Sequence, residues 1–201
     1  MNRHNIDISI IVVNHNRSNY IERCLRSCID QVLFNKNFEV IFIDDASKDN
    51  SFEIAKKFRS SVRLFQLKKN KGISYASNFA IKKSNGKYFI RVDSDDYINK
   101  HTIDFMSEIL KKNQSVAFVY CDHHRIDEYG NVEKIVRLKN KEILKNHGAG
   151  IMFNKKIFKD YGGYNQKLAE AEDYEILDKI LKKEKAFYLP LPLYRYYIHK
   201  K

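Results

Sequence analysis

The sequence is poor in the features that define secreted and membrane-spanning proteins. It holds three cysteines among 201 residues, Cys24, Cys28 and Cys121, and so small and odd a number excludes a disulfide framework. No apolar run approaches the roughly 20 residues that a helix needs to cross a bilayer, and residues 1–7 are too polar to form a signal peptide. We therefore expect a cytoplasmic protein in a reducing environment.

Three motifs that define other α/β proteins are also missing. The residues after the first predicted strand are Asn14, His15, Asn16 and Arg17, which excludes the G-x-G-x-x-G turn of dinucleotide oxidoreductases. No P-loop and no G-x-S-x-G nucleophile elbow occurs in the chain. Internal repeats and linkers rich in Pro, Gly or Ser are absent too, so the length suits one domain over residues 1–201.

Positive charge is what the sequence has in excess. The 37 Lys and Arg residues outnumber the 25 Asp and Glu residues and give a formal net charge of +12. Such an excess attracts polyanions, but the lysines are scattered in pairs that are typical of solvated helix ends. Because charge is the sole argument for nucleic-acid binding, we expect no nucleic-acid partner. Peripheral contact with the inner face of an anionic membrane stays open.

Short β-branched runs alternate with amphipathic segments through residues 1–100. The first predicted helix carries Ile21, Leu25, Cys28 and Val32 at helical spacing, and Asn19 with Glu22 matches a capping box. The β-α-β-α-β-α-β order predicts an α/β fold with a parallel, Rossmann-like sheet flanked by helices, whose ligand lies at the carboxyl ends of the strands. The predicted strands are residues 8–13, 38–43, 62–67 and 88–92, and the two later helices cover residues 50–58 and 73–84.

The pattern over residues 101–201 is less regular. We interpret residues 1–100 as the nucleotide-binding half of the domain and residues 101–201 as a smaller mixed half. The predicted elements of this second half are a helix at 102–112, a strand at 116–120, a hairpin turn at 127–131, a short strand and helix between the glycines at 148–150 and 162–163, a helix at 172–183 and a strand at 187–189.

Acidic clusters mark the ends of three of these elements. Asp44 and Asp45 end the second predicted strand, Asp93-Ser94-Asp95-Asp96 ends the fourth, and Glu170-Ala171-Glu172-Asp173 opens a helix. Three Asp within four residues repel one another unless a cation compensates, and Mg²⁺ takes one or two protein carboxylates plus diphosphate oxygens. The pattern predicts a metal that bridges protein and a nucleoside diphosphate. Helix caps are the alternative for both strand-end clusters, and a response-regulator phosphate pocket is another for the first.

Six segments, in this order, carry a resemblance to one family. They are residues 8–17, 40–51, 70–78, 86–96, 172–175 and 191–200. The second is close to V-D-D-G-S-x-D-x-S, the fourth to G-x-Y-I-x-x-L-D-x-D-D, the fifth to E-D-x-[DE] and the last to Y-x-Y-x-x-H. Across nearly its whole length the chain resembles the family-2 glycosyltransferases of the GT-A fold. That resemblance implies a mostly parallel central sheet with a smaller, mixed acceptor-side half.

The resemblance also implies a role for each matching residue. The catalytic base would be Asp173. The divalent ion, Mn²⁺ or Mg²⁺, would be held by Asp95, Asp96 and His199. Because Ser77 stands where family members often carry Arg, a diphosphate contact would be either lost or supplied by Arg17 or Lys71. The residues implied to bind the nucleotide sugar are Val13, His15, Arg17, Asp45, Asn78, Asp93 and Asp95.

The function that the resemblance implies is an inverting sugar transfer. The donor would be a nucleoside diphosphate sugar, UDP-linked, and the acceptor a hydroxyl of a glycan or lipid-linked glycan in surface polysaccharide synthesis. Two alternatives stay open. One is a catalytically silent nucleotide-sugar-binding module, suggested by Ser77 and by a C-terminal truncation soon after His199, where relatives continue. The other is a sugar-phosphate nucleotidyltransferase, whose Gly-rich basic loop has no counterpart at residues 14–17. The sequence leaves the sugar, the acceptor and the oligomeric state unspecified.

Overall fold

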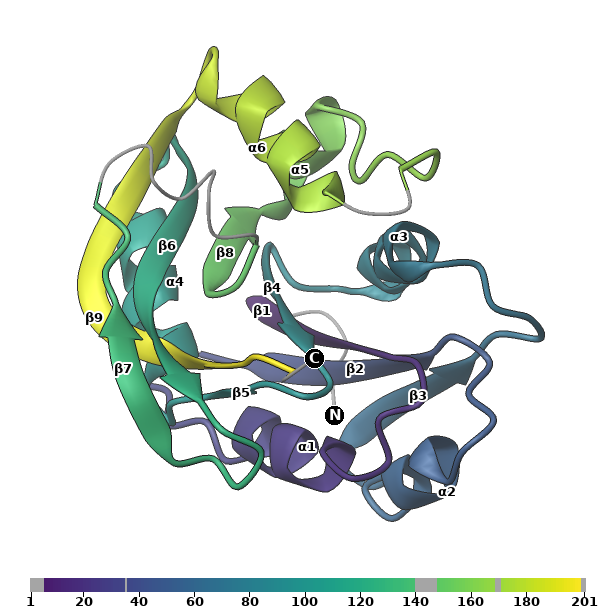
Figure 1. Ribbon diagram of the computed structural model, residues 1–201. Helices are drawn as coiled ribbons and strands as arrows, with labels where there is room; N and C mark the ends of the chain where they lie inside the picture. The colour runs from purple at the N-terminus through teal and green to yellow at the C-terminus, as the bar shows by residue number, and fades with distance from the viewer. Residues whose placement is uncertain (1–5, 35, 140–147, 169–170, 200–201) are drawn as a thin grey trace.

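One mixed sheet organises the protein, and it curls so that its two halves face a common space (Figure 1). The computed structural model describes residues 6–34, 36–139, 148–168 and 171–199. Within these residues the strand order is β3-β2-β1-β4-β8-β6-β9-β5, and β7 pairs with the side of β6. The sheet therefore runs without a break from the first half of the chain into the second.

The first half of the sheet is parallel, as predicted. Its strands are β1 (Ile8–Asn14), β2 (Phe38–Asp44), β3 (Val62–Gln66) and β4 (Tyr88–Asp93). The pairing places Val13 opposite both Ile43 and Asp93. Because parallel strands end at the same edge, the predicted acidic segments after β2 and β4 come together there.

Helices cover both faces of this parallel half. On one face lie α1 (Ile21–Ile29) and α2 (Ser51–Lys56), and on the other lies α3 (Ile73–Lys83) (Figure 1). Two separate apolar clusters fill the interfaces: residues of α1 pack on one face of β1 and β2, and residues of α3 pack on the other. Burial on both faces explains why these strands are almost continuously apolar in sequence.

Two predictions about α1 are wrong. The helix ends at Ile29, and the side chain of Val32 is half exposed because the chain has turned so that the Val32 amide donates to the Lys100 carbonyl. The predicted capping box is not formed either. Arg17 O accepts the amides at the start of the helix, and Glu22 pairs with the side chain of Arg26 instead.

Helix α2 starts where it was predicted, and Asp49 binds its first turn. The helix begins after Asn50, whose side chain makes no capping hydrogen bond. The carboxylate of Asp49 accepts both the amide and the hydroxyl of Ser51 instead. These bonds satisfy an amide in the first turn, where a helix has no internal partner.

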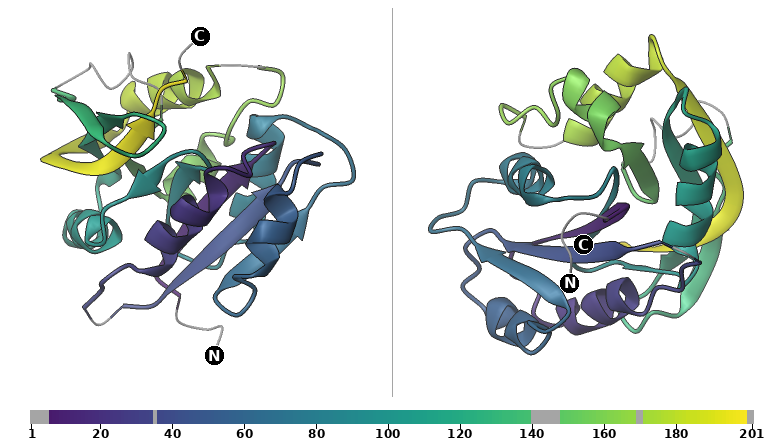
Figure 2. Two further views of the ribbon diagram at one scale, coloured as in Figure 1. Left: turned by 60° about the horizontal axis from the view of Figure 1, so that its bottom comes forward. Right: turned by 180° about the vertical axis from the view of Figure 1, so that it is seen from behind.

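The second half completes the sheet with longer strands than the sequence predicts. After β5 (Tyr97–Ile98), α4 (Thr102–Lys112) follows as predicted. Strands β6 (Val116–Ile126) and β9 (Lys185–Tyr197) run parallel over their whole length (Figure 2). Their pairing shifts register beside Pro192, because a proline cannot donate to the ladder. That irregularity and the polar residues of β6 interrupt the alternation of apolar and polar residues. The sequence therefore predicts only residues 116–120 and 187–189 of these two strands.

Shorter elements complete the second half of the fold. The hairpin turn predicted at residues 127–131 joins β6 to β7 (Val132–Val136). The short strand and helix predicted between the glycines are β8 (Ile151–Asn154), which joins β4 to β6, and α5 (Lys155–Asp160). Helix α6 (Glu172–Leu181) begins where predicted. None of the described helices is both long and apolar enough to span a lipid bilayer.

Candidate active site at the carboxyl edge of the sheet

Backbone strain is concentrated at the edge where β1, β2 and β4 end. Among the described residues, the non-glycine positions with positive φ are Asn16 at 54°, Ala46 at 57° and Ala171 at 65°. They lie just after β1, just after β2 and just before the predicted catalytic base. Residues with side chains rarely adopt this conformation, and where they do the strain tends to gather at functional sites.

Asp44 and Asp45 are both buried, but their carboxylates serve the protein itself. Asp44 accepts hydrogen bonds from the side chains of Asn14 and Gln66 and from both the amide and the hydroxyl of Ser47. Such a carboxylate is satisfied by neutral donors and ties the ends of β1, β2 and β3 together. The helix-cap interpretation does not apply to Asp44, because α2 begins only after Asn50 and its first turn is bound by Asp49.

Asp45 fixes the approach to α3. Its two carboxylate oxygens accept the amides of Lys71 and Gly72, each at 2.8 Å, in the turn that precedes the helix. Its carbonyl oxygen lies 2.9 Å from Nδ1 of His15. The structure thus brings together Asp45 and His15, two of the residues predicted to bind the nucleoside, while Val13 lies buried just before them in β1. Their contact with a nucleotide stays a prediction.

Asp95 has a different environment, because its partners carry positive charge or can acquire it. Oδ2 of Asp95 lies 2.9 Å from Nε of Arg17 and 2.7 Å from Nε2 of His199. These residues lie 78 and 104 positions away along the chain. The structure therefore joins three residues predicted to bind diphosphate and metal, and it brings the end of the chain onto the D-x-D segment.

Asp96 faces the interior instead. Its side chain is 1% exposed; Oδ2 accepts the hydroxyl of Tyr194 at 2.7 Å and Oδ1 accepts the amide of Tyr197 at 2.8 Å. Desolvation and the neighbouring carboxylates of Asp95 and Asp93 raise the pKa of Asp96 well above its usual range. In this arrangement Asp96 anchors β9 behind Asp95. Its predicted role as a direct metal ligand is not visible in its contacts.

The donor atoms present fit a divalent ion held in part by its substrate. No cluster of three or more candidate ligands occurs in the described part of the chain. The Asp95 carboxylate and the His199 imidazole nevertheless meet at one exposed point. One carboxylate and one imidazole, completed by diphosphate oxygens, suit Mn²⁺ or Mg²⁺, which retain open positions for phosphate.

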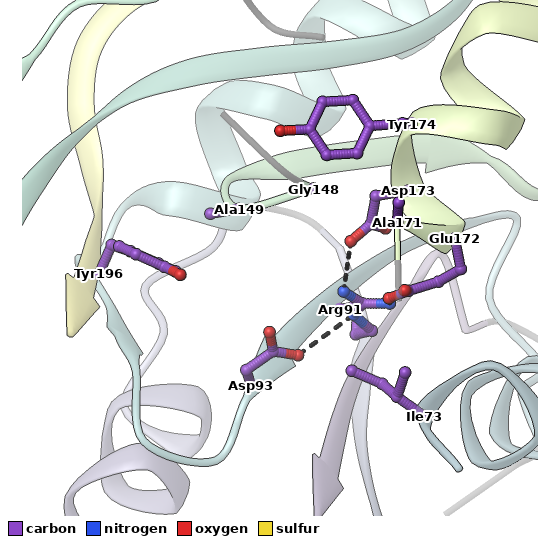
Figure 3. A pocket seen from close by; sticks show the side chains of 10 residues that line it. All are labelled: Ile73, Arg91, Asp93, Gly148, Ala149, Ala171, Glu172, Asp173, Tyr174 and Tyr196. Carbon is purple, nitrogen blue, oxygen red and sulfur yellow. Dashed lines mark hydrogen bonds and ion pairs between the residues drawn. The ribbon is translucent and has the colours of Figure 1, made fainter. Parts of the chain in front are cut away.

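A cavity of about 430 Å³ opens beside this edge, and Asp173 lies in its wall (Figure 3). Asp93 and Arg91 of β4 form another side, and the rings of Tyr174 and Tyr196 lie at its flanks. Only 6% of Asp173 is exposed. The predicted base and the predicted sugar-binding Asp93 therefore share one cavity, although 80 residues separate them in the sequence.

Arg91 is the residue at this site that the sequence analysis missed. Its Nη2 lies 2.7 Å from Oδ2 of Asp173, its Nη1 lies 3.0 Å from Oε1 of Glu172, and its Nε lies 3.2 Å from Oδ1 of Asp93. Desolvation raises the pKa of Asp93 to about 6, against the opposing effect of the Arg91 charge. An arginine inside the apolar run of β4 was the available signal, because a charged side chain is almost never buried without partners.

Asn78 occupies a structural position. Its side-chain amide donates to the carbonyl of Tyr164 at 2.7 Å and accepts the amide of the same residue at 3.1 Å. Asn78 lines a separate cavity of about 330 Å³, together with Phe158 and Gly163. Both ends of the Asn78 side chain are thus engaged by backbone, and its predicted contact with a nucleotide sugar stays a prediction.

Gly148 approaches the base closely. A Cβ atom at this position would overlap the carboxylate of Asp173, and one at Gly150 would meet Sγ of Cys121 at 2.9 Å. The structure shows that both allow close packing against side chains of the protein. Glu170, at the start of the third acidic cluster, lies outside the described residues.

A curled mixed sheet flanked by helices is the architecture of the GT-A glycosyltransferase structures that match this chain. The model of glycosyl transferase family 2 matches residues 9–162. The chain therefore belongs to this family, and the resemblance that its motifs indicated is confirmed.

Solved structures support the fold. The structure of TarS residues 1–349 from S. aureus in complex with UDP-GlcNAc matches with a TM-score of 0.83 at 25% identity, over 98% of this chain and 60% of that chain. The complex of the same protein with UDP gives a TM-score of 0.81. A mannosyltransferase from Pyrobaculum calidifontis in complex with GDP-Man and Mn²⁺ has a TM-score of 0.74 at 16% identity and shows the shared fold alone.

Curated relatives agree with the family. A chondroitin synthase of Escherichia coli is 29% identical over 188 residues, which cover 86% of this chain and 26% of the relative. An uncharacterized glycosyltransferase of Rickettsia conorii is 29% identical over 194 residues, which cover 87% of this chain and 31% of the relative. The chain thus spans less than a third of the length of these two relatives, and it is a glycosyltransferase by family.

Proposed function

We propose that the chain is an inverting glycosyltransferase that moves a sugar from a UDP-sugar to a hydroxyl group. One observation carries this proposal: Asp173 and Asp93 face the same cavity at the carboxyl edge of the sheet. A base on one side of a reacting sugar and a donor-binding edge on the other is the arrangement that a single displacement requires. The complexes of TarS with UDP and UDP-GlcNAc support the choice of donor.

Asp173 is suited to the role of base by its position and by its partners. Arg91 binds one of its carboxylate oxygens, Oδ2. The carboxylate would accept the proton of the acceptor hydroxyl while that oxygen attacks the anomeric carbon. The bond from the anomeric carbon to the diphosphate breaks on the opposite face, so the configuration at that carbon inverts.

The donor's nucleotide would lie along the ends of β1 and β2. His15, Asp45 and the backbone of Val13 would contact the nucleoside, and Arg17 would move from Asp95 towards the diphosphate. A divalent ion, when bound, would stabilise the negative charge of the leaving diphosphate. Asp95 and His199 would hold that ion, and Asp96 would hold Asp95 in place through β9.

The acceptor would be a hydroxyl of a glycan or a lipid-linked glycan. Relatives named as chondroitin synthase and as a poly(ribitol-phosphate) β-N-acetylglucosaminyltransferase support this class. The rings of Tyr174 and Tyr196 at the flanks of the cavity offer flat surfaces against which a sugar can pack. The net charge of +12 would favour a location at the inner face of an anionic membrane, where lipid-linked acceptors lie.

A thermal-shift screen of nucleotide sugars, with and without Mn²⁺, tests this function. A ligand at a concentration of about 100 times its Kd stabilises the folded chain by about 2.7 kcal/mol. UDP-sugars should therefore raise the Tm, and Mn²⁺ should increase that rise. Sugars that bind are then assayed for turnover, and NMR of the product reports its anomeric configuration. Absence of any shift with UDP-sugars, or a product of retained configuration, would contradict the proposal.

A further inference from the structure

Arg91 is a charged residue in a place that the fold normally reserves for apolar ones. Its neighbours in β4, Ile90 and Val92, are fully buried, and Arg91 itself is 7% exposed. Its three guanidinium nitrogens each lie within 3.2 Å of a different carboxylate, those of Asp93, Glu172 and Asp173. Because all three nitrogens are engaged, the guanidinium influences the site by way of the carboxylates that it holds.

The carboxylates that Arg91 joins come from two elements that lie far apart in the sequence. Asp93 ends β4, whereas Glu172 and Asp173 form the first turn of α6, 81 and 82 residues after Arg91. That turn follows Ala171, whose φ of 65° is unfavourable for a residue with a side chain. Such a conformation persists where surrounding contacts fix it, and the two ion pairs to Arg91 are contacts of this kind.

Asp173 is confined from the opposite side as well. The backbone at Gly148 passes so close that a Cβ atom would overlap the carboxylate. Arg91 binds Oδ2 at 2.7 Å, and a Cβ atom at Gly148 would come within 2.8 Å of both carboxylate oxygens. Held between a guanidinium and a glycine, the carboxylate has little freedom to rotate, and its remaining open direction is the cavity (Figure 3).

Arg91 is itself held in place by α3. Its guanidinium carbon lies 5.1 Å from the centre of the Tyr164 ring, which is buried. Tyr164 is fixed in turn by Asn78, whose side chain binds both its amide and its carbonyl. A continuous series of contacts thus leads from α3 through Tyr164 and Arg91 to Asp173. This gives Asn78 a function that does not require contact with a nucleotide.

We propose that Arg91 is a positioning residue of the transfer reaction: it holds Asp173 in the one orientation from which its carboxylate faces the acceptor. This inference rests on the proposed function, because it assumes that Asp173 is the base. The planar guanidinium is what permits three carboxylates to be held at once. An ammonium group at the same place is a point charge without this fork.

The test compares Arg91→Gln and Arg91→Lys with a matched control, Arg63→Gln. Arg63 also pairs with a carboxylate across the same sheet, that of Glu39, but away from the cavity. The probes are UDP with Mn²⁺ for binding by calorimetry and UDP-GlcNAc, or the sugar selected by the thermal-shift screen, for turnover. Since misplacing a reacting group by about 1 Å loses about 100-fold in rate, kcat should fall about 100-fold in Arg91→Gln.

The division between kcat and KM distinguishes positioning from a merely structural role. UDP affinity and the donor KM should stay within about threefold of the wild type, because a group that acts only on the chemical step lowers kcat alone. Arg91→Lys should recover part of the loss, and guanidinium ion should partly restore turnover to Arg91→Ala. A kcat of Arg91→Gln close to that of Arg63→Gln, or a parallel fall of kcat and UDP affinity, would overturn the proposal.

A second measurement keeps failure of this proposal distinct from failure of the proposed function. Labelling of carboxylates with a carbodiimide and glycine ethyl ester, read by mass spectrometry, needs no turnover. Asp173 should be labelled several times faster in Arg91→Gln than in the wild type, and equally slowly in Arg63→Gln. Unchanged labelling of Asp173 would overturn the positioning role even if no UDP-sugar is turned over by the wild type.

Gly148→Ala covers the case in which Arg91→Gln does not fold. This change leaves Arg91 and its three carboxylates intact and displaces Asp173 from the opposite side. We expect kcat to fall while UDP affinity is kept. Retention of the wild-type kcat in a folded Gly148→Ala protein would show that the orientation of Asp173 does not limit the reaction, and the proposal would then be wrong.

Discussion

Two pairs of aspartates, at the ends of the two strands that flank β1, look alike in sequence and differ in their partners in the folded protein. Asp44 and Asp45, after β2, bind amides, hydroxyls and side-chain amides. Asp93 and Asp95, after β4, bind guanidinium and imidazole groups. Neutral donors fix Asp44 and Asp45 as parts of the framework, and the buried Arg91 does the same for Asp93. The partly exposed Arg17 and His199 beside Asp95, by contrast, can give way to a metal or a substrate. The predictions below test this difference, from the largest expected effect to the smallest.

The largest effect is expected for Asp173→Asn. The substitution keeps the shape of the side chain but removes its basicity, and because a general base contributes about 100- to 10,000-fold to the rate, transfer should fall by about that factor. UDP affinity should survive, since Asp173 is proposed to act on the acceptor hydroxyl and not on the nucleotide. Steady-state turnover and calorimetry check both statements, and turnover near the wild-type rate would remove Asp173 from the role of base.

Asp44→Ala tests the framework half of the comparison. The change leaves Asn14, Gln66 and Ser47 without their buried acceptor, so the free energy of unfolding should fall by about 3 kcal/mol. Urea unfolding measures this. Asp178→Ala, at an exposed ion pair with Lys182, is the control and should change the stability by less than about 0.5 kcal/mol. Equal stabilities of the two variants would contradict the framework role.

Asp95→Asn tests the exchangeable half. Loss of a carboxylate ligand should weaken Mn²⁺-dependent UDP binding about tenfold or more, as is common when a metal site is disturbed. The free energy of unfolding should hardly change, because Arg17 and His199 are partly exposed and lose little. Calorimetry with and without Mn²⁺ separates the two quantities. A large loss of stability with unchanged Mn²⁺ dependence would place Asp95 with the framework residues.

The smallest effect is expected for Glu39→Gln, a residue with both kinds of partner. Desolvation would raise its pKa, but hydrogen bonds from the Asn85 amide and Ser9 and the ion pair with Arg63 lower it below its usual value of 4.5. A lowered pKa stabilises the fold above pH 4.5, and that contribution is lost as the pH falls through the folded-state pKa.

The stability difference between wild type and Glu39→Gln should therefore be largest near pH 7, and about 1 kcal/mol or less, because Arg63 is partly exposed. It should shrink below pH 4. Urea unfolding at pH 7 and pH 3.5 measures the difference, and a gap that grows on acidification would have the wrong sign.

The parallel half of the sheet and helix α4 could be predicted because their sequence signals are local. A buried strand such as Ile8–Asn14 is apolar in nearly every position, and α4 over Thr102–Lys112 has regular helical spacing. The strands predicted at 116–120 and 187–189 lie within β6 and β9, but the full lengths of these strands escaped prediction because several of their residues serve contacts between the two strands. Asp122, for example, is fully buried and accepts the hydroxyl of Tyr188 and the amide of Leu138. Such a polar residue interrupts the alternation on which sequence analysis depends.

The sequence by itself determined the family, the succession of the first four strands along the chain and the edge at which the acidic residues gather. Each of these was recognised from short segments of neighbouring residues. Only the tertiary structure decided which carboxylates face cations, which face amides and which, like that of Asp96, turn inward. The partners of Asp95 and Asp173 lie about 80 residues or more away. The environment of a charge is set by those distant groups, and folding alone brings them within hydrogen-bond distance.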